Sequence, residues 1–278
     1  MKKYFLAIAN YPDWRQSFFE EKVQPRFKEY CEQHSYQYLY YSDEIKKIRN
    51  SYTWNKPFII NDLLNNELDE GDLITSFDAD VIIVDKNKEF IPKKGKSFTY
   101  AIDTSNTHNM GLYSLFNNDW TKKLFSNLID EERYLSLSRK FTYHEKLYNY
   151  SKFWEELPHQ ASLYSLFGIK RHSDDSFLKM KDYGWNSNVD TWTKYKTEEL
   201  HKHVEIKETK WNVTEVRGES SCIFYVNKVP YNKVIIRHFA GPQKWRDIWL
   251  EKNTLKFHTK FLNPRRLIIN LIKWLLKK

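Results

Sequence analysis

The run that decides the fold is LITSFDADVIIVD, which occupies residues 73–85. It is apolar over most of its length, as a strand buried in a parallel sheet is, but it carries Asp78 and Asp80 near its centre. Two carboxylates at this spacing are costly to bury unpaired, so they need a cation or a position where the strand leaves the core. At the carboxyl end of a strand they suit Mg²⁺ or Mn²⁺. Taken alone, the pair is equally compatible with a solvated turn.

Strand and helix patterns alternate before this run. Residues 4–9 and 36–41 are typical of strands, and residues 18–34 and 54–65 carry apolar side chains at helical spacing. The β-α-β-α-β order predicts an α/β fold with a mixed, mainly parallel sheet flanked by helices.

Composition excludes several classes of protein. The chain has 278 residues, of which 41% are hydrophobic and 29% charged. This composition argues against disorder, and the length suits one sizeable domain. Seven glycines leave no Gly-rich phosphate loop, and two cysteines cannot form a disulfide framework or a thiolate zinc site. The apolar run at residues 4–9 is shorter than that of a secretory signal, and no stretch has the length of a membrane span.

A second motif, VIIRHFAGPQKW, occupies residues 234–245. It predicts a strand that ends at His238 and is followed by Gly241 and Lys244. An imidazole can complete a mixed oxygen and nitrogen coordination sphere, glycine allows close backbone approach, and lysine suits a diphosphate. Taken alone, His238 is also typical of a structural core histidine.

The two motifs together resemble the nucleotide-sugar site of retaining GT-A glycosyltransferases, in particular the group of the bacterial lipooligosaccharide galactosyltransferases and glycogenin. The galactosyl- and xylosyltransferases with a DxD motif are also similar. Two stretches between the motifs strengthen this resemblance. NMGLYSLFNNDW at residues 109–120 resembles the family's Asn-x-Gly strand, and PHQASL at residues 158–163 resembles its Asp-Gln-x-x-Leu motif. The four motifs stand in family order and cover most of residues 1–250.

The resemblance implies a Rossmann-like GT-A domain over residues 1–250. It implies that Asp78, Asp80 and His238 bind Mn²⁺ or Mg²⁺, and that Lys244 and Gly241 hold the diphosphate of a UDP-sugar. The other positions that it implies for the donor and the reaction centre are Ala9, Asn10, Tyr11, Lys56, Asn109, Gly111, His159 and Gln160.

Within that set, Ala9, Asn10 and Tyr11 correspond to the base and ribose site, and Lys56 to a basic position before the metal motif. Asn109 and Gly111 would line the sugar, and Gln160 would lie below the anomeric carbon. His159 departs from the pattern, because the family usually has aspartate there. The departure leaves the sugar hydroxyl contact, and with it the donor sugar, open.

Positive charge is concentrated at the end of the chain. The net charge is +9, and residues 252–278 contain eight basic residues and no acidic one, so the remainder carries +1. Residues 263–278 place apolar and basic side chains on opposite faces of an expected helix. A basic amphipathic helix suits an anionic membrane surface, although it could also pack on its own domain. Because the positive charge is confined to this segment, it argues against a general nucleic-acid-binding surface.

We therefore expect a GT-A domain over residues 1–250 and a membrane-associating tail over residues 251–278. The expected activity is metal-dependent transfer of a hexose from UDP to a surface glycan or glycolipid, as in lipopolysaccharide biosynthesis, with retention. The enzyme is expected to be cytoplasmic and peripheral on the inner face of the cell membrane. The alternatives are a divalent-metal nucleotidyltransferase, which would need a Gly-rich loop near the first strand, and a non-catalytic protein that binds membrane or nucleic acid.

Overall fold

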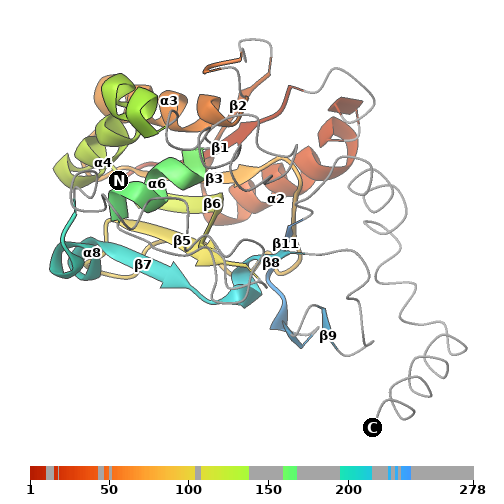
Figure 1. Ribbon diagram of the computed structural model, residues 1–278. Helices are drawn as coiled ribbons and strands as arrows, with labels where there is room; N and C mark the ends of the chain where they lie inside the picture. Colours follow the sequence, from red (N-terminus) through yellow and green to blue (C-terminus); the bar gives the residue numbers. More distant parts are fainter. Residues whose placement is uncertain are drawn as a thin grey trace, which may run out of the picture.

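The computed structural model (Figure 1) describes eleven stretches of the chain. They are residues 1–10, 16–17, 19–42, 47–49, 52–103, 108–137, 159–167, 195–214, 225–226, 229–230 and 233–238. No helix within these stretches has both the length and the apolar character needed to cross a bilayer. The tail expected over residues 251–278 lies outside the described residues.

A six-stranded sheet forms the centre of the fold, in the order β2-β1-β3-β6-β5-β7. β1 is parallel to β2 and β3, and β5 is parallel to β7, whereas β6 runs antiparallel to both of its neighbours. The strands are β1 (Lys3–Ile8), β2 (Gln37–Tyr41), β3 (Leu73–Asp78), β5 (Phe98–Ile102), β6 (His108–Phe116) and β7 (Val204–Lys207). The predicted α/β fold with a mixed, mainly parallel sheet is confirmed.

Helices cover both faces of this sheet (Figure 1). α3, α4 and α6 contribute to the apolar cluster on one face, and α2 with η1 contributes to the cluster on the other. The helical elements are η1 (Phe19–Val23), α2 (Gln24–His34), η2 (Tyr52–Trp54), α3 (Asn55–Asp62), η3 (Leu63–Glu67), α4 (Asp119–Ile129), α6 (His159–Phe167), α8 (Thr197–His203) and η5 (Thr209–Trp211).

The sequence of β1 explains why it lies between two helical layers. Tyr4 and Leu6 belong to the cluster under α3, α4 and α6, whereas Phe5 and Ala7 belong to the cluster under α2. Successive side chains of a strand point to opposite faces, so a strand covered on both sides needs an unbroken apolar run. That is why residues 4–9 carry no polar side chain until Asn10.

A second sheet of three strands adjoins the first. It consists of β4 (Val81–Ile83), β11 (Ile236–His238) and β8 (Val213–Thr214), in the order β4-β11-β8, with β4 antiparallel and β8 parallel to β11. A separate two-stranded pairing joins β9 (Tyr225–Val226) and β10 (Val229–Pro230). The apolar run at residues 73–84 is therefore divided between two sheets, with a turn at Ala79 and Asp80.

Candidate metal and donor site

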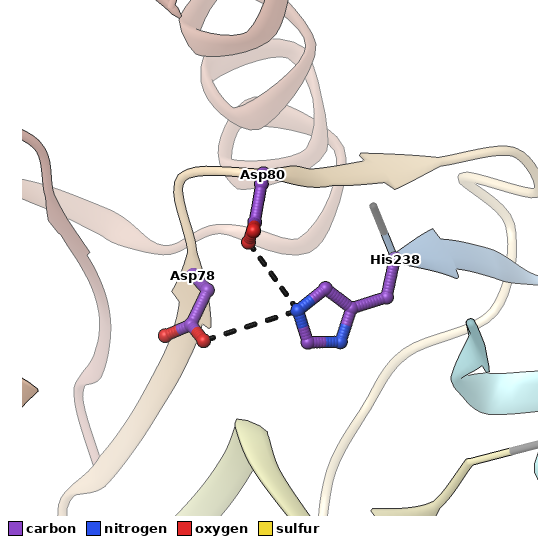
Figure 2. A group of neighbouring side chains, drawn as sticks. All are labelled: Asp78, Asp80 and His238. Carbon is purple, nitrogen blue, oxygen red and sulfur yellow. Dashed lines mark ion pairs between the residues drawn. The ribbon is translucent and has the colours of Figure 1, made fainter. Parts of the chain in front are cut away.

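The turn between β3 and β4 brings three potential metal ligands together. Asp78 is the last residue of β3, Asp80 lies in the turn, and His238 is the last residue of β11. One ligand atom from each of the three lies within 4.8 Å of the others. Figure 2 shows that both carboxylates face the same ring nitrogen: His238 Nε2 is 3.3 Å from Asp80 Oδ1 and 4.0 Å from Asp78 Oδ2.

Strand pairing places His238 in this group. β11 is antiparallel to β4, and His238 lies opposite Val81, the residue that follows Asp80. The ladder therefore carries the imidazole to the turn where the two aspartates leave the main sheet. Residues separated by more than half of the chain thus meet because two short strands pair.

The chemistry of this group fits a divalent cation. Carboxylate oxygens suit Mg²⁺ and Mn²⁺, and imidazole suits several divalent metals. His238 and Asp80 are buried, whereas the Asp78 side chain is 39% exposed, so the group is accessible from the side of Asp78. Burial alone would lower the pKa of His238, but the attraction of Asp80, together with Asp78 and Asp103, raises it above its usual value. Without a cation, the two carboxylates thus favour a proton on the imidazole.

Lys56 brings a buried positive charge to the same carboxylates. Its Nζ donates to Asp78 Oδ1 at 2.9 Å, to the carbonyl of Gly111 at 3.0 Å and to that of Met110 at 3.3 Å. It also lies 4.4 Å from the centre of the Tyr113 ring. Burial lowers its pKa, although Asp78 opposes the shift. When the imidazole is neutral, as binding of a cation requires, the two aspartates and the one lysine carry one net negative charge.

Gly111 allows β6 to pass close to the three ligands. β6 is antiparallel to β3, and the pairing of Phe77 with Leu112 brings Gly111 beside Asp78. A Cβ atom at position 111 would lie 2.4 Å from His238 Cε1 and 2.8 Å from Asp78 Oδ2. Asn109 Oδ1 accepts a 2.7 Å hydrogen bond from the backbone N–H of Gly111, so the Asn-x-Gly stretch has a defined shape here.

Gln160 is held against the same strand from α6. Its Oε1 accepts from the backbone N–H of Met110 at 3.0 Å, and its Nε2 donates to the hydroxyl of Tyr164 at 3.0 Å. Tyr164 in turn donates to the carbonyl of His108. Two hydrogen bonds therefore fix both ends of the Gln160 amide relative to β6, next to the residues that contact Lys56.

His159 begins α6, and its ring is buried. Neither ring nitrogen is bonded to any part of the chain that the structure describes. Its ring centre is 6.4 Å from that of Trp54, which it meets edge to face. Burial, and secondarily the charge of Lys56, lowers its pKa to about 3. The imidazole is therefore neutral near pH 7 and offers one donor and one acceptor that the described residues do not use.

The remaining predicted site residues fall into two groups. Ala9 and Asn10 follow β1, and the pairing of Ile8 with Asp78 puts them at the same edge of the sheet as the metal ligands. Ala9 is buried and donates its backbone N–H to the carbonyl of Tyr41 at 3.1 Å. Three predicted residues, Tyr11, Gly241 and Lys244, lie outside the described residues.

The structure adds one residue that sequence analysis did not single out. Asn212 is fully buried, and its Oδ1 lies 3.0 Å from His238 Nδ1. A lone asparagine 26 positions before the histidine gives no pattern by which to recognise it. The contact depends on the pairing of β8 with β11, which local periodicity does not reveal.

Comparison with known proteins gives matches among solved structures only. No family model matches the chain, and no curated protein matches it. A glycosyltransferase involved in glycosylation of the major capsid of PBCV-1 matches with a TM-score of 0.49 and 12% identity, over 91% of this chain and 100% of that one. Mouse xyloside xylosyltransferase 1 matches with a TM-score of 0.42 and 9% identity, over 88% and 99%.

A third similar structure is the galactosyltransferase LgtC in complex with donor and acceptor sugar analogs. Its TM-score is 0.38 and its identity 8%, over 86% of this chain and 87% of that one. All three of these proteins are described as glycosyltransferases.

We predict that Gly111→Ala weakens metal binding without unfolding the protein. The added Cβ would overlap His238 Cε1 and crowd Asp78 Oδ2, so the ligands must separate. Displacing metal ligands in this way should lower the affinity for Mn²⁺ by about 10- to 100-fold, measured by titration calorimetry. Gly95→Ala is the control, because a Cβ at Gly95 meets open space and only the positive φ of +82° is strained. Equal Mn²⁺ affinity in Gly111→Ala and the unchanged chain would contradict this account.

We also predict that His159 makes the fold sensitive to acid. Its pKa is about 3 in the folded chain and about 6.5 when unfolded, so the unfolded chain binds more protons between these values. Stability attributable to this ring is therefore lost as pH falls below 6.5. His159→Gln should reduce the loss of unfolding free energy between pH 7 and pH 5 by about 2 kcal/mol, measured by urea denaturation.

The control for His159→Gln is His201→Gln, which removes an exposed histidine from α8. This control should retain the acid sensitivity of the unchanged chain. If His159→Gln also loses as much stability as the unchanged chain, the ring is not buried in its neutral form.

Proposed function

We propose that this chain is a metal-dependent glycosyltransferase that moves a hexose from a UDP-sugar to a glycan or glycolipid acceptor. The observation that carries the proposal is the group of Asp78, Asp80 and His238, whose ligand atoms lie within 4.8 Å of one another. The group lies at the carboxyl end of β3, the edge at which open α/β sheets bind their ligands. The four motifs that resemble GT-A enzymes support the same assignment.

The residues around the three ligands suit a nucleotide diphosphate. A divalent cation held there supplies positive charge to a departing diphosphate. Lys56 adds a buried cation beside Asp78, and we propose that Lys244 and Gly241 contact the diphosphate from the segment after β11. We assign the base and ribose to the exit of β1, at Ala9, Asn10 and Tyr11.

We place the sugar between β6 and the start of α6. Asn109 and Gly111 of β6 would contact the sugar together with Gln160, whose amide is held against β6 by Met110 and against Tyr164. An amide oxygen is a weak nucleophile but can stabilise positive charge at the anomeric carbon, so we infer that Gln160 acts electrostatically in a retaining transfer. Among the described residues the ring nitrogens of His159 have no partner, so the neutral ring can donate a hydrogen bond to one sugar hydroxyl and accept one from another.

We predict that Asp80→Asn abolishes Mn²⁺-dependent release of UDP from a panel of UDP-sugars. An amide lacks the charge that holds the cation, so the rate should fall by about 1000-fold, equal to ~4 kcal/mol. Asp85→Asn is the matched control in the same run, because within the described residues the hydrogen bond of the Asp85 side chain is to the backbone N–H of Asn87, in the loop that follows. Full activity of Asp80→Asn, or of the unchanged chain in excess EDTA, would refute the metal-dependent mechanism.

We propose further that residues 263–278 dock a cytoplasmic enzyme on the inner face of the cell membrane, where the acceptor is a glycolipid such as a lipopolysaccharide precursor. The support is the separation of basic and apolar residues in this segment of the sequence. Each basic residue near an anionic leaflet contributes about 1 kcal/mol.

We predict that replacing Arg265, Arg266, Lys273 and Lys277 by glutamine releases the protein from vesicles that contain phosphatidylglycerol. Co-sedimentation at low and high salt measures this, and transfer to a short soluble acceptor should be retained. The control replaces four exposed lysines of the globular part, Lys88, Lys94, Lys123 and Lys202, and so removes the same charge elsewhere. Equal release by both sets would mean that total charge, and not the segment, determines binding.

A further inference from the structure

His238 is held by a neighbour on the side opposite the aspartates. The ring nitrogen that faces Asp78 and Asp80 is Nε2, and the other nitrogen points away from them (Figure 2). That other nitrogen, Nδ1, lies 3.0 Å from Oδ1 of Asn212, which is completely buried. We infer that Asn212 is a positioning residue that fixes the His238 tautomer and ring orientation for metal binding; this inference rests on the proposed metal site.

The chemistry of the contact determines the tautomer. An amide oxygen can only accept a hydrogen bond, so Nδ1 of His238 must carry the proton. In a neutral ring the lone pair then belongs to Nε2, the atom within reach of both carboxylates. Metal-binding histidines are commonly oriented by a hydrogen bond of this kind from the other ring nitrogen. Asn212 thus selects the form of His238 that can bind a cation together with Asp78 and Asp80.

The backbone around Asn212 holds the amide in a fixed position relative to His238. Asn212 follows η5 and donates its backbone N–H to the carbonyl of Thr209 at 2.8 Å. The next residues form β8, in which Thr214 pairs with His238 itself. Lys210 accepts a 2.9 Å hydrogen bond from the backbone N–H of Ile235, just before β11. The segments that carry the amide and the imidazole are therefore joined on both sides of the contact.

An aromatic contact anchors this segment to the core. The Trp211 ring, next to Asn212, meets the fully buried Phe90 ring edge to face with centres 5.4 Å apart. Trp211 also packs against the cluster that contains Phe77 of β3. The Asn212 amide is thus held in a fixed position relative to β3, the strand that ends in Asp78. Rigid elements therefore support the site on both sides.

A neutral amide gives the position a distinct electrostatic role. It orients the ring without adding to the net negative charge of the group of Asp78, Asp80 and Lys56. A carboxylate at position 212 would accept the same hydrogen bond, make the imidazole more basic and strengthen its attraction for a cation. Position 212 can therefore be tested by removing the acceptor and by restoring it in charged form.

The experiment measures binding of Mn²⁺ alone to the full chain, by electron paramagnetic resonance of free Mn²⁺. Asn212→Ala should weaken binding by about 10- to 100-fold, and Asn212→Asp should bind at least as tightly as the unchanged chain. The control is Asn117→Ala, because Asn117 is equally buried but donates to the carbonyls of Leu68 and Asp69. This control is expected to lose stability and to keep its affinity for Mn²⁺.

A second measurement needs no substitution. In the unchanged, metal-free chain, ¹⁵N NMR at a pH where the ring is neutral should show His238 with its proton on Nδ1. A proton on Nε2 would mean that the Asn212 amide donates to the ring, and it would overturn the inference. This readout decides the question even where Asn212→Ala fails to fold.

The outcomes separate this inference from the proposed function. The unchanged chain and Asn212→Ala could bind Mn²⁺ with equal affinity while Asp80→Asn does not bind it. That result would overturn the role of Asn212 and leave the metal site in place. Failure of Asn212→Asp to restore the affinity lost in Asn212→Ala also overturns it. If the unchanged chain and Asp80→Asn both fail to bind Mn²⁺, the inference and the proposed metal-dependent function fall together.

Discussion

The candidate site depends on one constraint, the antiparallel pairing of β4 with β11 immediately after the turn at Ala79 and Asp80. Without it the run from Leu73 would end with two carboxylates at the rim of a sheet and with Lys56 as the cation beside them. The pairing sets His238 opposite Val81 and so adds a nitrogen atom that could bind a metal. It also brings in β8, and with it the amide of Asn212. The group of three potential metal ligands is thus formed by the junction between two sheets.

The residues around this junction are closely packed, so the neighbouring strand β6 and its contacts have little room to move. β6 passes the ligands at a distance that a side chain at position 111 would not permit. The same strand gives its carbonyls to Lys56 and a backbone N–H to Gln160, so the cation and the amide are located by one backbone. A buried lysine is costly unless it is paired, and the ion pair with Asp78 offsets that cost. The contacts of Lys56 with Asp78 and with the β6 carbonyls therefore determine both the charge of the site and the positions of its side chains.

Features that depend on residues close together in the sequence could be predicted. Features that depend on the pairing of distant strands could not. The fold class followed from the alternation of strands and helices, and Asp78 and Asp80 were recognisable because carboxylates interrupt an apolar run. The division of that run between two sheets was not foreseen, since either half of it has the periodicity of one strand. Asn212 was missed for a related reason: a hydrogen bond to His238 requires β8 beside β11, and neither strand is long enough to indicate its partner.

The order of the elements along the chain has a consequence for biosynthesis. The strands β1, β2, β3, β5 and β6 are all complete by Phe116, whereas His238 belongs to a strand made much later. At about 5–20 residues per second, a nascent chain carries Asp78 and Asp80 for roughly 10–30 s before the histidine is translated. Lys56 precedes both aspartates in the sequence, so an internal counterion is present from the start. The ion pair with Asp78 can thus neutralise one of the two carboxylates while the sheet is incomplete and His238 is not yet synthesised.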